Sequence, residues 1–575
     1  MKTRTLMAAA LAATAFGAFA DFEINLDLAA KPIRDHEKNR CSPVIGYAGA
    51  LADLNGDLSD DVMFISNKVQ TAKLCRAAGA WYVRVWSAND WWYRSTPQYL
   101  EELKAKGKLH KKNRTNPKAA FEFWKQNGIK VSFTLEQWGW HKGDRTTVDF
   151  VKWIVDNGYQ DVVADFELGN ETYFCPIPQQ QRIAANWTEI IPEIRKLMPT
   201  VPLGIPIAEY FENDPDVAQI RKRLLEDKDP IVRTNYFSVT QSSRNSAAFL
   251  VAMSNALPQV THVIYHCYGG ETPYSCSYYG YKRYRNLAEA FPVLKRMKWL
   301  LTEVRVRSDE DDRCQRMFRE SLWLGHYFLM SLAQPEIDGI NYHNIMALSG
   351  ALYIARGSGQ KWSYRVQWRD GGGEYPDYGT VYGIPNHDIG SAANVFRYYT
   401  EAIKQYPRVL AHGTSKARDA EKCFYACSEL MDQVYARRRA LKEGRRGADV
   451  PKVDGEVEWL ATSGPNGVCL LMVNTKSTAE RFTVSVKDKL LAAPNYRTMS
   501  CDEKFLDCRE IPGDPKPWRT VSWEDTCQGF ESVSMDRYVG MKPKCDSLEL
   551  EIAPHTVQTV SFCVRNKPQP KPEKK

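Results

Sequence analysis

The feature that most constrains the fold is an alternation, repeated eight times, of a short apolar run with a helix-like segment. The runs are rich in β-branched and aromatic residues, as buried strands are. Strands that alternate with helices form parallel sheets, and eight such units close into a barrel. We therefore predict an α/β fold with a (β/α)8 TIM barrel over 21–406. The expected strands are Val44–Ala50, Trp81–Trp86, Ile129–Leu135, Val162–Leu168, Val201–Ile207, Thr261–Tyr268, Met297–Glu303 and Ile337–His343.

A change of pattern past Pro407 indicates a second domain. From there, short runs that alternate or stay apolar are separated by turn residues, which is typical of antiparallel sheets. We predict a C-terminal all-β sandwich domain over 407–566, and a strand at 22–28 is a candidate addition to it. The Pro- and Lys-rich tail 567–575 is expected to be disordered.

The N-terminus carries a signature of export. Two basic residues precede the apolar run Leu6–Phe19, and Ala18–Ala20 has the small-x-small form of a cleavage site. We predict a signal peptide over 1–20. The alternative is a membrane anchor, but a span needs ~20 apolar residues. We therefore expect a secreted or periplasmic protein with no integral membrane segment.

The cysteines also fit an oxidising compartment, because the chain has fourteen of them. Eight crowd the last third, where we predict disulfides whose connectivity the sequence does not give. A metal cluster is the weaker alternative, since no C-x-x-C pairs recur there and the histidines do not cluster near cysteines. The eight are Cys423, Cys427, Cys469, Cys501, Cys508, Cys527, Cys545 and Cys563.

The formal net charge of +8 is modest for 575 residues. Excess positive charge attracts polyanions, but no basic run lies on a recognisable nucleic-acid-binding module. The run Arg437–Arg446 is explained more simply as a solvated helix end or linker. We expect no nucleic-acid partner.

The functional site of a barrel of this kind lies at the C-terminal ends of its strands. No glycine-rich phosphate loop, HExxH motif or GxSxG elbow is present, so neither a metal nor a cofactor is expected. The residues expected at the strand ends are Arg84, Trp86, Glu136, Trp138, Asn170, Glu171, Glu209, Tyr210, His266, Tyr268, Glu303, Tyr342 and His343.

Two of these residues, Glu171 and Glu303, stand at the C-terminal ends of the fourth and seventh expected strands. Paired carboxylates at a barrel mouth, surrounded by aromatic residues, suit glycoside hydrolysis. One protonates the leaving oxygen, and the other attacks the anomeric carbon when the two are ~5–5.5 Å apart, which retains the configuration. Glu136 and Glu209 are the runner-up candidates. Glu167 is expected to point into the barrel wall or into a polar layer of the barrel core, with no assigned role.

The run Leu168–Glu171, together with Thr302-Glu303, resembles the clan A retaining glycoside hydrolases. The likeness covers residues 21 to about 566, and the barrel with its β-sandwich is most similar to α-L-arabinofuranosidases, β-xylosidases and heparanase-like β-glucuronidases. The paired motif is specific for the clan rather than for one family. Thr172 stands where many relatives have proline, and Tyr342-His343 where several families have tryptophan.

The resemblance implies that Glu171 is the general acid/base and Glu303 the nucleophile. A cation and a hydroxyl donor beside the nucleophile would lower its pKa, whereas the acid needs a raised pKa. Arg84 would supply the cation, with a purely structural ion pair as the alternative. The resemblance further implies that Asn170 binds the sugar 2-hydroxyl and that His266 and Tyr268 form an H-x-Y motif whose tyrosine bonds the nucleophile. The remaining expected substrate contacts are Trp86, Trp138, Tyr342 and His343.

Aromatic loops suggest how substrate is held. The segments 89–93, 137–141 and 274–285 offer flat faces for sugar rings, with packing under loops as the alternative. Nearby cations make an anionic sugar an option, with solvated charge as the alternative. They are Lys282, Arg283, Arg305 and Arg307. We therefore expect a secreted retaining glycoside hydrolase acting on a polysaccharide or oligosaccharide. The alternative is a non-catalytic carbohydrate-binding surface protein on the same barrel.

Overall fold

The computed structural model describes most strands of the expected barrel and of the C-terminal β region, together with many of the helices. Several expectations fall on residues outside this part, among them the signal peptide, Trp86, Trp138, Glu209 and most of the aromatic loops. For Tyr268, Arg305, Tyr342 and His343 the backbone is described and the side chain is not. The described residues are 20–36, 45–48, 82–85, 87–108, 117–136, 145–207, 245–269, 288, 291–306, 318–343, 353–355, 387–389, 391–416, 436, 439–440, 443–445, 449–451, 455–465, 467–492, 494–501 and 545–568.

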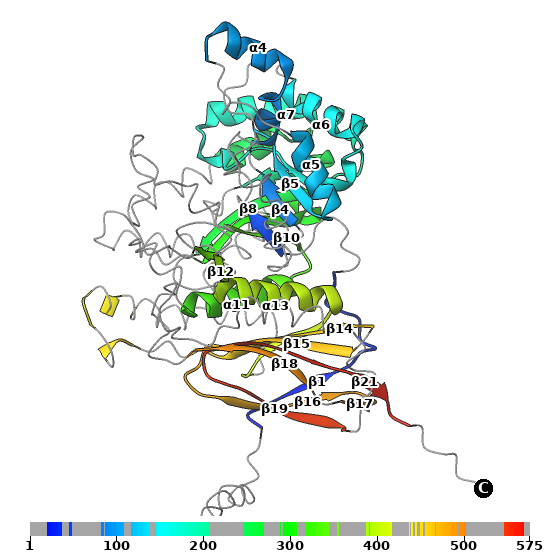
Figure 1. Cartoon of the computed structure of the whole chain (residues 1–575), viewed down its shortest axis with the longest axis vertical. Helices are drawn as coiled ribbons and strands as arrows, with labels where there is room; N and C mark the ends of the chain where they lie inside the picture. The colour runs from blue at the N-terminus through cyan, green and yellow to red at the C-terminus, as the bar shows by residue number, and fades with distance from the viewer. Residues whose placement is uncertain are drawn as a thin grey trace, which may run out of the picture.

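Eight parallel strands form a closed barrel, which confirms the predicted fold class. Each strand pairs with the next along the chain, and the last pairs with the first through Ile340 and Ile45. The barrel lies at one end of the molecule, shown in blue to green in Figure 1. The strands are β3 (Ile45–Ala48), β4 (Tyr82–Val85), β5 (Lys130–Thr134), β6 (Val163–Glu167), β7 (Leu203–Pro206), β8 (His262–Gly269), β9 (Lys298–Val306) and β10 (Ile337–His343).

Helices cover the outside of the barrel where the sequence places amphipathic segments. One of them begins at Pro117, where a missing N–H costs nothing in the first turn. Its apolar face buries Phe121 and Trp124. The helices are α3 (Ala88–Tyr93), α4 (Pro97–Ala105), α5 (Pro117–Gln126), α6 (Thr146–Asp156), α7 (Ile177–Leu197), α11 (Phe318–Ala333) and α13 (Ser391–Gln405), with short 3-10 turns η2 (Gln160–Val162), η3 (Thr172–Phe174), η4 (Leu257–Gln259) and η5 (Pro292–Arg296).

The barrel strands divide their side chains by alternation. In β4, Val83 and Val85 belong to the apolar core shared with the helices, while Tyr82 and Arg84 form buried hydrogen bonds across the barrel. Neighbouring side chains of a strand point to opposite faces, so the second pair faces the barrel axis. The barrel axis is therefore polar where Tyr82 and Arg84 face it, whereas barrel cores are usually filled by bulky apolar side chains.

The C-terminal strands form two facing sheets. One is six-stranded, in the order β18-β20-β15-β14-β13-β2, and the other is three-stranded, in the order β1-β16-β19. The N-terminal strand thus pairs with the C-terminal region. The domain limits themselves stay a prediction. The strands are β1 (Phe22–Leu26), β2 (Arg34–Asp35), β13 (Arg408–Thr414), β14 (Val457–Gly464), β15 (Gly467–Asn474), β16 (Glu480–Val486), β18 (Asn495–Ser500), β19 (Ser547–Ile552) and β20 (Thr556–Phe562), with the short pairs β11 (Tyr353–Ala355) with β12 (His387–Ile389), and β17 (Lys489–Leu491) with β21 (Val564–Asn566).

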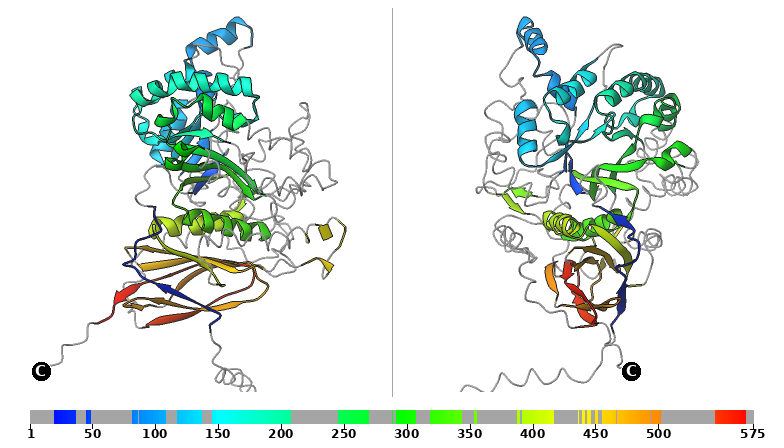
Figure 2. Two further views of the ribbon diagram at one scale, coloured as in Figure 1. Left: turned by 180° about the vertical axis from the view of Figure 1, so that it is seen from behind. Right: turned by 90° about the vertical axis from the view of Figure 1, so that its right-hand side faces the viewer.

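The strand β15 shows why the sandwich sits against the barrel. All its residues are buried, because one face packs into the sandwich and the other against helices. Leu470 and Met472 belong to the sandwich core, while Leu471 and Val473 belong to the core shared with the barrel. The helices α11 and α13 lie between the barrel and the six-stranded sheet in all three views (Figures 1 and 2). A continuous apolar core therefore joins the two regions.

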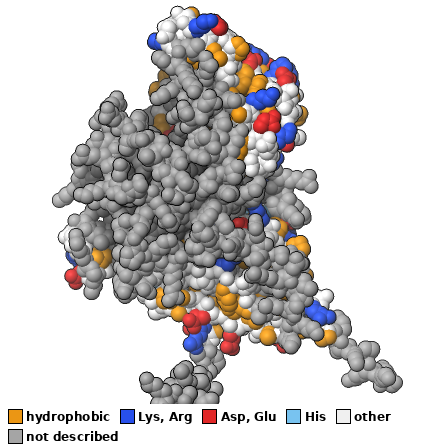
Figure 3. Space-filling view, in the orientation of Figure 1, with side chains coloured by type: hydrophobic (Ala, Val, Ile, Leu, Met, Phe, Trp, Pro, Cys, Tyr) orange, Lys and Arg blue, Asp and Glu red, His pale blue; other side chains and the backbone are white. Residues whose placement is uncertain are grey.

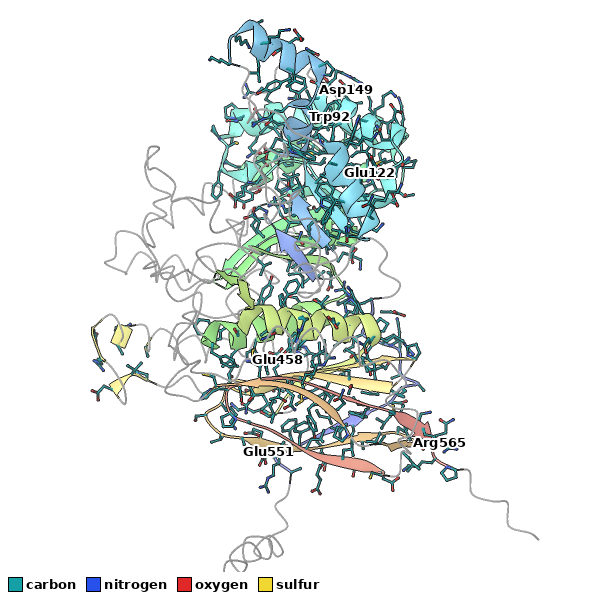
Figure 4. The ribbon with its side chains drawn as sticks, viewed as in Figure 1. Trp92, Glu122, Asp149, Glu458, Glu551 and Arg565 are labelled. Atoms are coloured by element: carbon teal, nitrogen blue, oxygen red, sulfur yellow. The ribbon has the colours of Figure 1, made fainter. Side chains whose placement is uncertain are left out.

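A buried polar triad joins helix α11 to the six-stranded sheet. Glu458 of β14 is hydrogen-bonded to His326 of α11 and, at 2.6 Å, to Nε2 of His412 in β13. Burial alone would raise the pKa of Glu458, but the two histidines outweigh it and lower that pKa. Glu458 is seen between the helix layer and the sheet in Figure 4. We regard the triad as structural.

The cysteine prediction is not confirmed. Cys469, Cys545 and Cys563 are free thiols in the structure. Cys423, Cys427, Cys508 and Cys527 lie outside the described residues, so disulfides among them stay a prediction.

The described surface carries mixed charge. On the face shown in Figure 3, basic and acidic side chains are interspersed over the helices at the barrel end. Among the described residues, we find no helix with the length and apolar character that a membrane crossing requires.

Candidate active site

Arg84 is the centre of a buried network at the top of the barrel axis. Its guanidinium makes two hydrogen bonds to Glu167, Nε to Oε1 at 2.7 Å and Nη2 to Oε2 at 2.6 Å. Its Nη1 donates to Oε1 of Glu303 at 2.5 Å, and Nη2 also donates to Oδ1 of Asn170 at 2.8 Å. The side chain is fully buried. One cation thus holds residues from β6, from the loop after it, and from β9 in one arrangement.

A β-bulge in β9 aims Glu303 at the axis. Ile264 of β8 pairs with Leu300, but His266 pairs with Glu303, so β9 has one residue more than its neighbour there. The pairing with β10 shows the same extra residue, between Leu301 and Val304. Leu301 and Val304 both belong to the outer core. The bulge therefore lets Thr302 and Glu303, which are adjacent, both face inward.

The strand carrying Glu303 also differs from expectation. We expected it to end at Glu303, whereas β9 continues to Val306. The bulge, rather than a strand end, therefore turns the buried Glu303 carboxylate toward the barrel axis.

Glu171 is presented by a tight turn after β6. Gly169 has φ of +101° and Glu171 itself has φ of +46°, a left-handed conformation that costs energy for a residue with a side chain. The Tyr173 hydroxyl donates to Oε1 of Glu171 at 3.2 Å. The carbonyl of Tyr173 in turn accepts from Asn245 at 2.8 Å. The turn is thus held from both sides with the Glu171 carboxylate 30% exposed.

His266 lies between the two glutamates. Its Nδ1 is 3.1 Å from Oε1 of Glu171 and 3.7 Å from Oε2 of Glu303, and its Nε2 is 3.2 Å from the Thr302 hydroxyl. Burial alone would lower the pKa of His266, but the charge of Glu303 and the hydrogen bond to Glu171 outweigh it and raise that pKa. One ligand atom from each of the three residues lies within 4.8 Å of the others.

These three residues are of types that bind metal ions, but their surroundings do not suit one. Glu303 already accepts a hydrogen bond from the Arg84 guanidinium, whose positive charge would repel a cation. The raised pKa of His266 also favours its protonated form, which is not a ligand. We therefore assign no metal to the trio.

A second polar layer supports the first from below. Asp165 accepts hydrogen bonds from Tyr82, at 2.8 Å, and from Ser132. Burial raises the pKa of Asp165 to about 6, against the lowering effect of Ser132. Above this layer, Thr134 of the same strand as Ser132 donates to Oε2 of Glu167 at 2.8 Å. The Thr134 hydroxyl thus helps to fix Glu167, which in turn holds Arg84.

The structure brings together five of the residues predicted for the site. They are Arg84, Asn170, Glu171, His266 and Glu303. Sequence reasoning missed the parts played by Glu167, Thr302 and Tyr173. For Glu167 a signal existed, because Asp165 and Glu167 alternate on one strand and must face the same side.

We expect Gly169→Ala to lower both stability and activity. A Cβ at this position would lie 2.6 Å from Cγ2 of Thr172, and the positive φ adds strain. The expected cost is about 1–3 kcal/mol in the free energy of unfolding, with a loss of about 100-fold in kcat if Glu171 shifts by ~1 Å. Gly158→Ala is the matched control, since Gly158 has φ of +69° and open space around it. Denaturant unfolding and steady-state kinetics check this, and equal activity losses in both variants would contradict it.

His266 predicts a pH dependence of stability. Folding raises the pKa of His266 above its ordinary value of 6.5. Its contribution to the free energy of unfolding is therefore fully present below pH 6.5 and is lost as the pH rises through the folded pKa. The difference in the free energy of unfolding between wild type and His266→Gln should therefore be larger at about pH 5.5 than at about pH 9. Urea unfolding at both pH values measures it. A difference that stays constant, or that grows with pH, would show the raised pKa to be wrong.

Comparison with solved structures supports the fold. The chain is similar to the α-L-arabinofuranosidase of Thermotoga maritima, with 11% identity and a TM-score of 0.54 over 95% of this chain and 100% of the other. It is also similar to a family 51 α-L-arabinofuranosidase of Thermotoga petrophila, at 10% identity and a TM-score of 0.52 over 94% and 99% of the chains. A family 51 α-L-arabinofuranosidase of Bifidobacterium longum is also similar, with 10% identity and a TM-score of 0.52 over 95% of this chain and 100% of the other. No protein-family model and no curated protein sequence matches the chain. These likenesses show that the chain shares the fold of these solved structures, a barrel with a β-domain, as the sequence predicted.

Proposed function

We propose that the protein is an exported retaining glycoside hydrolase that cleaves O-glycosidic bonds of a polysaccharide or oligosaccharide by double displacement. The observation that carries the proposal is the approach of Glu171 and Glu303, one oxygen of each lying within 4.8 Å of the other. Carboxyl groups at this separation suit retention, whereas inverting enzymes need room for a water between them, ~6.5–9.5 Å.

The two carboxyl groups have different surroundings, which supports different roles. The Glu303 side chain is 5% exposed and bound to Arg84, a cationic partner for a carboxylate nucleophile. The Glu171 side chain is 30% exposed, and the partners that the structure describes for it are His266, at 3.1 Å, and the Tyr173 hydroxyl, at 3.2 Å. We assign Glu303 as the nucleophile and Glu171 as the acid/base.

In the first step, Oε2 of Glu303 attacks the anomeric carbon. Attack by this oxygen preserves the bond between Oε1 and Arg84. The bond from the anomeric carbon to the leaving oxygen breaks as Glu171 donates its proton to that oxygen. Tyr173 and His266 both contact Oε1 of Glu171, so its Oε2 is the oxygen placed for proton transfer.

In the second step, Glu171 removes a proton from water, and the water oxygen attacks the anomeric carbon. The bond from the anomeric carbon to Oε2 of Glu303 breaks, which regenerates the carboxylate with Oε1 still bound to Arg84. Asn170, which Arg84 holds beside Glu171, is placed to bind a sugar hydroxyl. Two inversions at one carbon give net retention.

Arg84 does not itself favour an anionic sugar. Arg84 is already bound to two carboxylates and an amide, so it offers little to a sugar carboxylate or sulfate. The sequence candidates for binding such a group, Lys282 and Arg283, lie outside the described residues. The relatives named above act on α-L-arabinofuranosides, which makes these the first neutral substrates to test.

A panel of aryl glycosides tests the proposal. It should include arabinofuranosides, xylosides, glucosides and glucuronides in both anomers, and proton NMR should follow the first product formed. We expect turnover of one glycoside, with the anomeric configuration retained. Inverted product would contradict double displacement. Binding of sugars without turnover of any glycoside would instead support a non-catalytic carbohydrate-binding protein.

A further inference from the structure

We propose that Glu136 binds a hydroxyl group of the sugar whose glycosidic bond is cleaved, and so helps to decide which sugar the site accepts. This inference rests on the proposed glycosidase function and adds a specificity-determining residue to it.

The position of Glu136 follows from the strand that carries it. In β5, Val131, Phe133 and Leu135 belong to the outer apolar core. The extended run continues past the strand end, because the Leu135 N–H donates to the carbonyl of Glu167 at 2.8 Å. Glu136 therefore lies on the inward-facing row, above Thr134, whose hydroxyl bonds Glu167. That row places its carboxyl group at the level of the barrel mouth.

The backbone of Glu136 is fixed by the side chain of Asn89, which lies on α3. Its N–H donates to Oδ1 of Asn89 at 2.9 Å, and its carbonyl accepts from Nδ2 of Asn89 at 3.3 Å. Asn89 is itself buried. Ser87 hydrogen-bonds the Glu136 carboxyl group and adopts a left-handed conformation with φ of +47°. A strained residue held against a carboxyl group is typical of sites where orientation matters.

One oxygen of this carboxyl group lacks a donor. Glu136 is 9% exposed, and its Oε2 is buried and accepts no hydrogen bond from any residue that the structure describes. A buried acceptor left without a donor costs about 1–3 kcal/mol, more if charged. A sugar hydroxyl supplies the missing donor, so substrate binding would remove that cost.

The charged groups around Glu136 do not explain why a carboxyl group is buried there. Arg84 lies near enough to act on it, but the guanidinium donates its hydrogen bonds to Glu167, Glu303 and Asn170. Burial raises the pKa of Glu136 to about 7, against the lowering effects of Arg84 and Ser87. A merely structural residue at this place would be better as a neutral or apolar side chain, which avoids that cost.

The test uses Glu136→Gln, which keeps the shape of the side chain and its bond to Ser87. We expect KM for the best aryl glycoside to rise about 10-fold, equivalent to ~1.4 kcal/mol, with kcat less affected. The same kinetics are then measured on monodeoxy forms of that glycoside. On the analogue that lacks the contacted hydroxyl, wild type and variant should have equal KM values. A merely structural role would raise KM alike on all analogues.

The matched control is Glu122→Gln. Glu122 lies on α5, outside the barrel (Figure 4). Its Oε1 accepts a hydrogen bond from the Tyr159 hydroxyl at 2.7 Å. This variant should keep the wild-type KM. An unchanged KM in Glu136→Gln, or the same rise on every deoxy analogue, overturns the inference while leaving the proposed function intact. Absence of turnover of any glycoside by the wild type overturns both.

Discussion

Replacing Glu303 with Gln should lower kcat by about 10⁴-fold or more, because the covalent intermediate can no longer form. The amide has the shape of the carboxyl group but is a very poor nucleophile. Arg84 keeps its two bonds to Glu167 in this variant, so the barrel should still fold. Steady-state kinetics on the best aryl glycoside measure the loss, and circular dichroism with thermal unfolding confirms the fold.

A matched variant separates the role of Glu303 from a general loss of charge at the mouth. Glu136→Gln removes a neighbouring carboxylate and should lower kcat far less than Glu303→Gln. If Glu303→Gln retained more than about a tenth of wild-type kcat, the nucleophile would have to be another residue.

Replacing Glu171 with Ala should separate substrates by their leaving groups. Without the acid, alkyl and sugar leaving groups depart unprotonated, and we expect losses of about 10²–10⁴-fold. Activated leaving groups such as dinitrophenol need no proton, so the first step on them should stay fast. The second step lacks its base, and the glycosyl-enzyme should accumulate.

Azide provides the readout for this variant. The small anion needs no base, so it should attack the anomeric carbon where water cannot and restore turnover on activated substrates. The product should be a glycosyl azide with the substrate's configuration, which mass spectrometry and NMR detect. If Glu171→Ala hydrolysed all substrates at wild-type rates, or if azide gave no acceleration with any of them, Glu171 would not be the acid/base.

Much of the fold followed from local patterns. The barrel could be predicted because its strands are buried runs between helices with recognisable caps, such as Pro117 at the start of α5. The carboxyl-bearing loop Leu168–Glu171 could be placed at the mouth for the same reason, since every parallel strand ends on that side. Arg84, Asn170, His266 and Glu303 then meet because their strands or loops converge there.

What could not be predicted depends on long-range geometry. The bulge at Thr302 and Glu303 arises from pairing with two neighbouring strands, and no local pattern specifies it. The bidentate bond between Arg84 and Glu167 depends on register across two strand pairs. The left-handed backbone of Glu171 is an exception to its own conformational preference, held by surrounding contacts. Local preference fails where the site is built.

The most direct test of the account is covalent trapping. Activated 2-deoxy-2-fluoro glycosides of arabinofuranose, xylose, glucose and glucuronic acid should be incubated with the protein, followed by proteolysis and peptide sequencing by mass spectrometry. We predict that one reagent inactivates the protein with a stoichiometry of one and that the adduct maps to Glu303. An adduct on Glu171, Glu136 or any other carboxyl group, with Glu303 unmodified, would contradict it.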